Sequence, residues 1–108
     1  MATSYKVLGQ SAPAATTNTT LYTVPSATSA VCSTLSVCNM GASTTVRVAV
    51  RPAGASLASQ HYIVYDATVN QYDTLMLTLG ISLATTDVVT VYAGTSTVSF
   101  SLFGSEIS

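Results

Sequence analysis

Apolar and polar residues alternate with a period of two along most of this 108-residue chain, which is the spacing of a β-strand with one buried face. Between residues 44 and 51, for example, Val46, Val48 and Val50 point one way while Arg47 and Ala49 point the other. No segment sustains the 3.6-residue apolar spacing of an amphipathic helix. The pattern predicts strands at Tyr5–Gln10, Thr19–Val24, Ala30–Asn39, Thr44–Arg51, His61–Asp66, Thr74–Leu79, Asp87–Tyr92 and Thr97–Phe103.

Turn-forming residues such as Gly41, Pro52 and Gly94 separate these strands. Eight short antiparallel strands at near-regular spacing predict an all-β fold, a single β-sandwich of the jelly-roll or immunoglobulin-like type. The length suits one domain over residues 1–108. Within it, residues 1–20 hold the first strand and an Ala/Thr-rich stretch, which is either a long loop or an extended arm.

Alternation within each strand also selects the core. We expect the buried side chains to include Val46, Val48, Val50, Leu75, Leu77, Leu79, Val89, Val98, Phe100 and Leu102.

Both cysteines, Cys32 and Cys38, fall in one predicted strand. Six steps of about 3.3 Å put their Cα atoms roughly 20 Å apart, whereas a disulfide needs about 4.4–6.8 Å. We therefore expect two free thiols. Their even spacing predicts that they share one face of the strand, as small buried hydrophobic residues.

The composition combines 48% hydrophobic residues with only 6% charged residues and a formal net charge of −1. Serine, with 15 copies, and threonine, with 18, take the place of charged residues as the polar side chains. So few basic residues argue against binding to nucleic acid or an anionic membrane. No stretch reaches the ~18–20 apolar residues of a spanning helix, and the N-terminal residues do not resemble a signal peptide. We expect the chain to fold in the cytoplasm where it is made.

Candidate catalytic chemistry is sparse, because the chain has one histidine and no Gly-x-Ser-x-Gly motif. We predict no enzyme activity, no catalytic residues and no cofactor. His61 is expected to be an inert strand histidine on the face shared with Ile63 and Tyr65; the alternative is a ligand or a pH-sensitive contact.

Three carboxylates, Asp66, Asp73 and Asp87, fall at predicted strand ends or loops, where aspartate commonly makes local hydrogen bonds. A calcium site is the alternative, but no Asp-x-Asp cluster strengthens it. We predict no metal site.

Tyrosines recur in or beside the predicted strands. An exposed subset could stack on sugars or contact a partner protein, and Tyr62, Tyr65 and Tyr72 are the candidates. The alternative is that these rings pack in the core or across strands.

Several segments form a pattern that covers nearly the whole chain. They are Lys6–Thr17, Leu21–Pro25, Leu35–Asn39, Arg47–Val50, Asp87–Tyr92 and Val98–Glu106. In these segments the chain resembles a family of small all-β structural proteins of tailed bacteriophages. The resemblance implies a non-enzymatic virion protein, a tail, neck or fibre component, and it carries no active-site residues.

Physical considerations agree with an assembly role. Sandwich edges are commonly guarded by lysine, proline or inward-pointing charges, and this chain has one lysine. A surface with little charge is also inexpensive to desolvate. The expected partners are copies of itself, as a trimer by analogy with other phage sandwiches, and other virion proteins. The expected location is the virion, after assembly in the host cytoplasm; the alternatives are a capsid decoration (cement) protein and a carbohydrate-binding adhesin module.

Overall fold

The computed structural model describes residues 2–108, so Met1 of the predicted domain lies outside the described residues. It contains eight strands and two short 3-10 turns: β1 (Thr3–Ser11), β2 (Thr19–Thr23), β3 (Ser29–Asn39), β4 (Thr44–Arg51), η1 (Pro52–Gly54), η2 (Ser59–His61), β5 (Tyr62–Val69), β6 (Thr74–Leu83), β7 (Val88–Ala93) and β8 (Val98–Ile107). All eight predicted strands are present, and the all-β prediction is confirmed.

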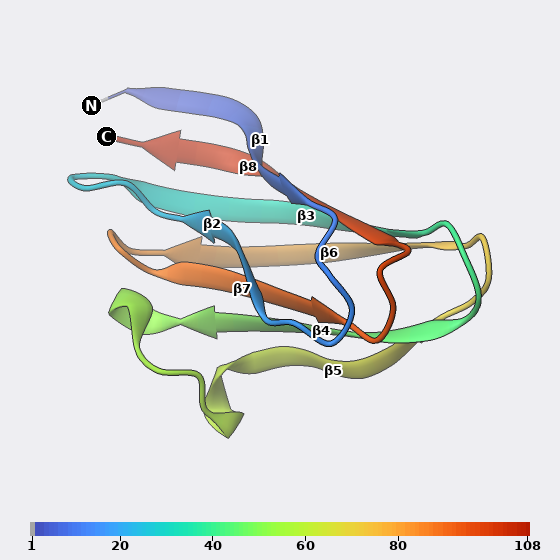
Figure 1. Cartoon of the computed structure of the whole chain (residues 1–108). Coiled ribbons are helices and arrows are strands. Elements are labelled where there is room, and N and C mark those ends of the chain that lie inside the picture. The colour runs from blue at the N-terminus through green and yellow to red at the C-terminus, as the bar shows by residue number, and fades with distance from the viewer. Residues whose placement is uncertain (1) are drawn as a thin grey trace.

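The strands form two antiparallel four-stranded sheets, in the orders β1-β8-β3-β6 and β2-β7-β4-β5 (Figure 1). We call them sheet A and sheet B. The chain changes sheet at every connection except the one from β4 to β5, which gives the strand order of a jelly roll. The Ala/Thr-rich stretch after β1 is the first of these crossings. It is therefore a loop between the sheets, tied to β7 by the bond from the Thr16 N–H to the Ala93 carbonyl.

One hydrophobic core draws side chains from both sheets. Of the ten predicted core residues, six are fully buried: Val46, Val48, Val89, Val98, Phe100 and Leu102. The other four, Val50, Leu75, Leu77 and Leu79, are partly buried and pack against that core. Three of these four lie in β6, an edge strand whose inner face is covered less completely than that of a central strand.

A bulge in β3 corrects the prediction that the two cysteines share a face. Cys32 pairs with Gly104 of β8 and Thr34 pairs with Phe103, so Ser33 is an extra residue between them. The bulge reverses the alternation, and Cys32 points into the core while Cys38 lies on the outer face of sheet A. Both thiols are free, as predicted. Burial raises the pKa of the Cys32 thiol to about 11.

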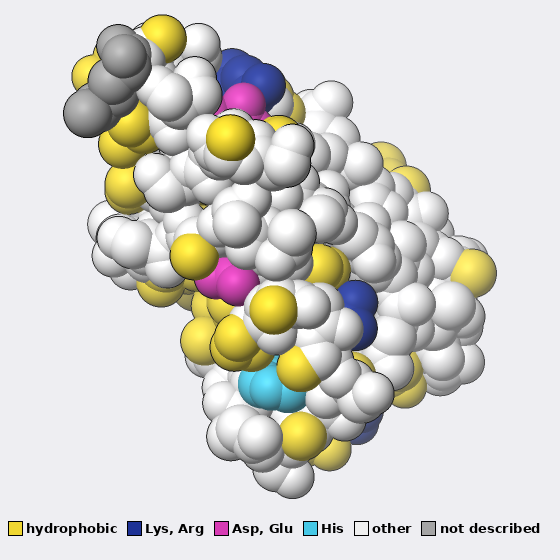
Figure 2. All heavy atoms as spheres, turned by 90° about the vertical axis from the view of Figure 1, so that its left-hand side faces the viewer, with side chains coloured by type: hydrophobic (Ala, Val, Ile, Leu, Met, Phe, Trp, Pro, Cys, Tyr) yellow, Lys and Arg dark blue, Asp and Glu magenta, His cyan; other side chains and the backbone are white. Residues whose placement is uncertain are grey.

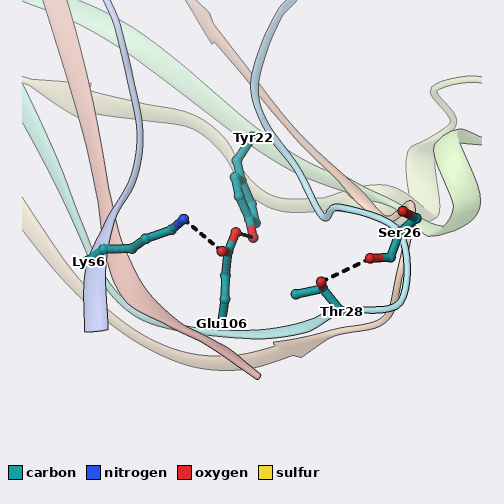
Figure 3. A network of polar contacts seen from close by, with 5 residues as sticks. All are labelled: Lys6, Tyr22, Ser26, Thr28 and Glu106. Carbon is teal, nitrogen blue, oxygen red and sulfur yellow. Dashed lines mark hydrogen bonds and ion pairs between the residues drawn. The ribbon is translucent and has the colours of Figure 1, made fainter. Parts of the chain in front are cut away.

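A polar network joins the two sheets beside strand β1 (Figure 3). Lys6 Nζ of β1 lies 2.7 Å from Glu106 Oε1 of β8, and the Tyr22 hydroxyl of β2 donates to Glu106 Oε2 at 2.5 Å. Hydrogen bonds from Lys6 and then from Tyr22 lower the pKa of Glu106. Burial, reinforced by Glu106, raises the pKa of Tyr22 well above its usual range. The network therefore depends on an ionised Glu106 and a neutral Tyr22.

Candidate functional site

Arg47 is the centre of a cluster on the outer face of sheet B, with Asp66, Tyr62, Tyr65 and Tyr92. We call these five residues the Arg47 cluster. The Arg47 guanidinium lies 4.4 Å from the Tyr65 ring centre and 4.5 Å from that of Tyr92. Its Nε donates to Asp66 Oδ1 at 2.6 Å and its Nη2 to Oδ2 at 3.3 Å. This fork geometry fixes the plane of the guanidinium, and the Asp66 hydrogen bond raises the pKa of Arg47.

Irregular pairing between β4 and β5 builds this cluster. Val46 pairs with Ala67 and Val48 with Val64, so Tyr65 and Asp66 together stand opposite Arg47. Asp66 takes a left-handed φ of 53° at this bulge, a conformation that aspartate tolerates better than most residues. The bulge brings both its carboxylate and the neighbouring Tyr65 ring to the guanidinium.

A second register shift, between Val48 and Ala49, brings Tyr62 beside Tyr65. In a regular strand two residues three positions apart point to opposite faces. Here the extra residue Ile63 puts both tyrosines on the outer face, with ring centres 5.0 Å apart and planes at 82°. The two rings and Ser59 line a surface hollow of about 470 Å³. Tyr65 is 60% exposed there despite its contact with Arg47.

Two of the three candidate contact tyrosines, Tyr62 and Tyr65, therefore come together, and the third does not. Tyr72 lies in the turn between β5 and β6, where its backbone N–H donates to the Gly41 carbonyl. Arg47 and Tyr92 were not predicted from the sequence as site residues. An arginine at an outward position among Val, Thr and Ala was the one available signal for this site.

The prediction for His61 is wrong in its position. His61 ends the η2 turn before β5 and is buried, so it does not share a strand face with Ile63 and Tyr65. Its Nδ1 accepts the backbone N–H of Ala58 at 3.1 Å. That bond closes the turn, so the imidazole has a local structural contact.

The three aspartates make separate local contacts. Asp66 binds Arg47 inside β5 and not at a strand end. Asp73 accepts the N–H of Thr74, and Asp87 accepts those of Ala53 and Ala84 at 2.9 Å each. Across residues 2–108 no three His, Cys, Asp or Glu side chains gather in a way that could hold a metal ion.

The outer face of sheet A is a second candidate surface. Its β1 and β8 positions bring together Tyr5, Val7 and Phe103, which border a hollow of about 590 Å³ with Val31, Ser105 and the charged Lys6. Tyr5 is 86% exposed. Lys6 and Glu106 alternate with these residues and turn toward Tyr22 instead. Apart from Lys6, which borders the hollow while its ammonium pairs with Glu106, strand alternation places no charged side chain of residues 2–108 on this face.

Charge is also sparse on the end of the molecule shown in Figure 2, where a few charged side chains are separated by hydrophobic and uncharged polar surface. Charge is absent from the edge strand β6 as well. Its ten residues, TLMLTLGISL, include no charge and no proline, and within the described part of the chain β6 pairs with β3 alone. Its other side leaves backbone N–H and C=O groups available for pairing.

Comparison with known proteins gave no match to this chain from any protein-family model, curated protein or solved structure. Among residues 2–108 there is no helix with the length and apolar character needed to cross a membrane.

Proposed function

We propose that this protein is a non-enzymatic structural protein of a bacteriophage virion, which self-associates and docks on the particle through sheet A. The observation that carries the proposal is the nearly uncharged outer face of sheet A, continuous with the unguarded edge of β6. A surface with so little charge loses little hydration energy when a second copy covers it. The edge offers main-chain hydrogen bonds to the same partner.

Exposed apolar side chains also support sheet A as the contact surface. Tyr5, Val7 and Met76 are all exposed on β1 and β6, and aromatic residues and methionine are enriched at protein interfaces. Identical copies can pair here without placing like charges opposite each other. A trimer is the proposed order, by analogy with other phage sandwiches, although two-fold dimers are commoner among soluble proteins.

Light scattering and sedimentation of the purified chain at micromolar concentration test self-association. We expect an oligomer that Tyr5→Glu dissociates, because the change places a carboxylate on a nearly uncharged face. Tyr72→Glu is the matched control, since it makes the same change at another exposed tyrosine and should leave the oligomer intact. A wild-type chain that stays monomeric would contradict the proposal.

Labelled antibody on intact particles tests the location. We place the protein at a tail, neck or fibre attachment point, for which the expected copy number is in the tens or fewer. Hundreds of copies over the capsid surface would favour the alternative, a decoration protein. A chain missing from purified particles would exclude both roles.

A further inference from the structure

We propose that the Arg47 cluster binds a neutral pyranose sugar, which packs against Tyr65 and Tyr62 in the hollow that they line with Ser59. This site lies on sheet B and does not rest on the proposal for sheet A. A protein that docks through one sheet would leave this site facing solvent.

The aromatic geometry is the first reason. A pyranose ring has an apolar C–H face, and an exposed tyrosine ring offers a flat apolar surface with a polar hydroxyl at its rim. Tyr62 and Tyr65 stand nearly perpendicular at 5.0 Å and form a corner. The hollow of about 470 Å³ beside them falls in the size range of small-molecule sites.

The polar groups around this corner suit hydroxyl groups. The Asp66 carboxylate accepts hydrogen bonds, and the Arg47 guanidinium has N–H groups beyond the two that Asp66 accepts. Ser59 and the Tyr62 hydroxyl can both donate and accept. Because Arg47 and Asp66 neutralise each other, the site has no net charge to attract an acidic sugar. A neutral sugar is therefore the expected class.

The site is also held in place before a ligand binds. Arg47 lies against both Tyr65 and Tyr92, and its two bonds to Asp66 fix the guanidinium. Two register shifts and a left-handed Asp66 are needed to bring these groups together. Bulges that re-aim side chains in this way are over-represented next to active sites.

A purely structural role for the cluster is the competing explanation. The contacts of Arg47 with Tyr65 and Tyr92 already tie β5 and β7 to β4, and this needs only those three residues and Asp66. It does not require Tyr62 to turn onto the same face, nor the exposure of Tyr65 beside a hollow. Binding measurements on variants that keep the fold separate the two explanations.

The experiment is an NMR titration of the isotope-labelled full chain with the methyl glycosides of glucose, galactose, mannose and N-acetylglucosamine, and with glucuronic acid as the acidic probe. We expect at least one neutral glycoside to shift the backbone signals of Ser59, Tyr62, Tyr65 and Asp66. Glucuronic acid should bind no more tightly than the neutral sugars.

Three variants define the contact. Tyr65→Ala should weaken binding about tenfold or more, which corresponds to the loss of one good contact, while Tyr65→Phe keeps the ring and should retain binding. Tyr72→Ala removes an exposed tyrosine elsewhere and should match the wild type. Thermal unfolding of each variant checks that the fold is kept. If Tyr65→Ala does not fold, Tyr62→Ala replaces it as the variant that removes a contact ring.

Shifts confined to the cluster and lost in Tyr65→Ala would establish the site. The proposal is overturned if no glycoside binds at millimolar concentration, if Tyr65→Ala binds as the wild type does, or if glucuronic acid alone binds. None of these outcomes bears on self-association, so the two proposals fail separately.

Discussion

Phe100 is the largest of the fully buried side chains, and it lies near the start of β8, a central strand of sheet A. Phe100→Ala leaves a cavity that the flanking strands cannot fill, and we expect it to lower the free energy of unfolding by about 3–5 kcal/mol. Urea unfolding followed by circular dichroism measures this loss. Phe103→Ala is the control: this ring is only partly buried, on the outer face, and its loss should cost much less. Equal losses would contradict the observed register.

Glu106 makes the stability of the fold sensitive to acid. Its contacts with Lys6 and Tyr22 lower its pKa in the folded state, so its stabilising effect is present above the unfolded-state pKa and is lost as the pH falls through the folded one. We therefore expect the free energy of unfolding to decline as the pH falls from about 5. Glu106→Gln should flatten that decline.

Urea titrations at several pH values measure the effect of Glu106. Tyr22→Phe is a useful partner variant, because it removes the hydroxyl donor and leaves the ion pair with Lys6 in place. It should flatten the decline only in part. A decline as steep in Glu106→Gln as in the wild type would assign the acid sensitivity to other carboxylates.

At the scale of the strands, Gly104 allows β8 to approach β3 closely. A Cβ atom at Gly104 would lie 2.0 Å from the Val31 carbonyl oxygen, so the backbone of β8 or β3 would have to move. We expect Gly104→Ala to destabilise the protein by about 1–3 kcal/mol, as overpacking does. Gly80→Ala is the comparison: nothing lies within 4 Å of its Cβ position, but its φ of 63° opposes a side chain. Thermal unfolding of both variants separates crowding from backbone strain.

Strand pairing also explains which parts of the structure the sequence could predict. Period-two alternation located all eight strands and most of the core, because one buried face imposes that spacing. Bulges do not alter composition, so nothing in the sequence showed that Ser33 would separate the faces of Cys32 and Cys38. For the same reason a regular strand predicted opposite faces for Tyr62 and Tyr65, and the Arg47 cluster could not be foreseen as a unit. His61 directly precedes Tyr62 and was predicted to begin the same strand. Its imidazole instead accepts the N–H of Ala58, and this bond holds the residue in the turn before β5.

For the whole molecule, the jelly roll separates two surfaces of different character. Sheet A has a nearly uncharged outer face and sheet B carries the Arg47 cluster, with the shared core between them. Mutations at distant sites without shared partners usually act independently. We expect Tyr5→Glu to abolish self-association with sugar binding unchanged, and Tyr65→Ala to do the reverse. Sedimentation and NMR titration of both single variants and of the double variant measure this, and a loss of both properties in either single variant would contradict it.

The β3 bulge has one further consequence, because it leaves the protein with two thiols of unequal accessibility. Cys38, on the outer face of sheet A, should react with a maleimide in the native protein, whereas the fully buried Cys32 should react only when the core opens. The slow reaction, at Cys32, would then report the rate at which the core opens. The fast reaction, at Cys38, would be slowed wherever another subunit covers the outer face of sheet A. The chain therefore contains its own footprinting probe for a contact on that face, with no engineered label.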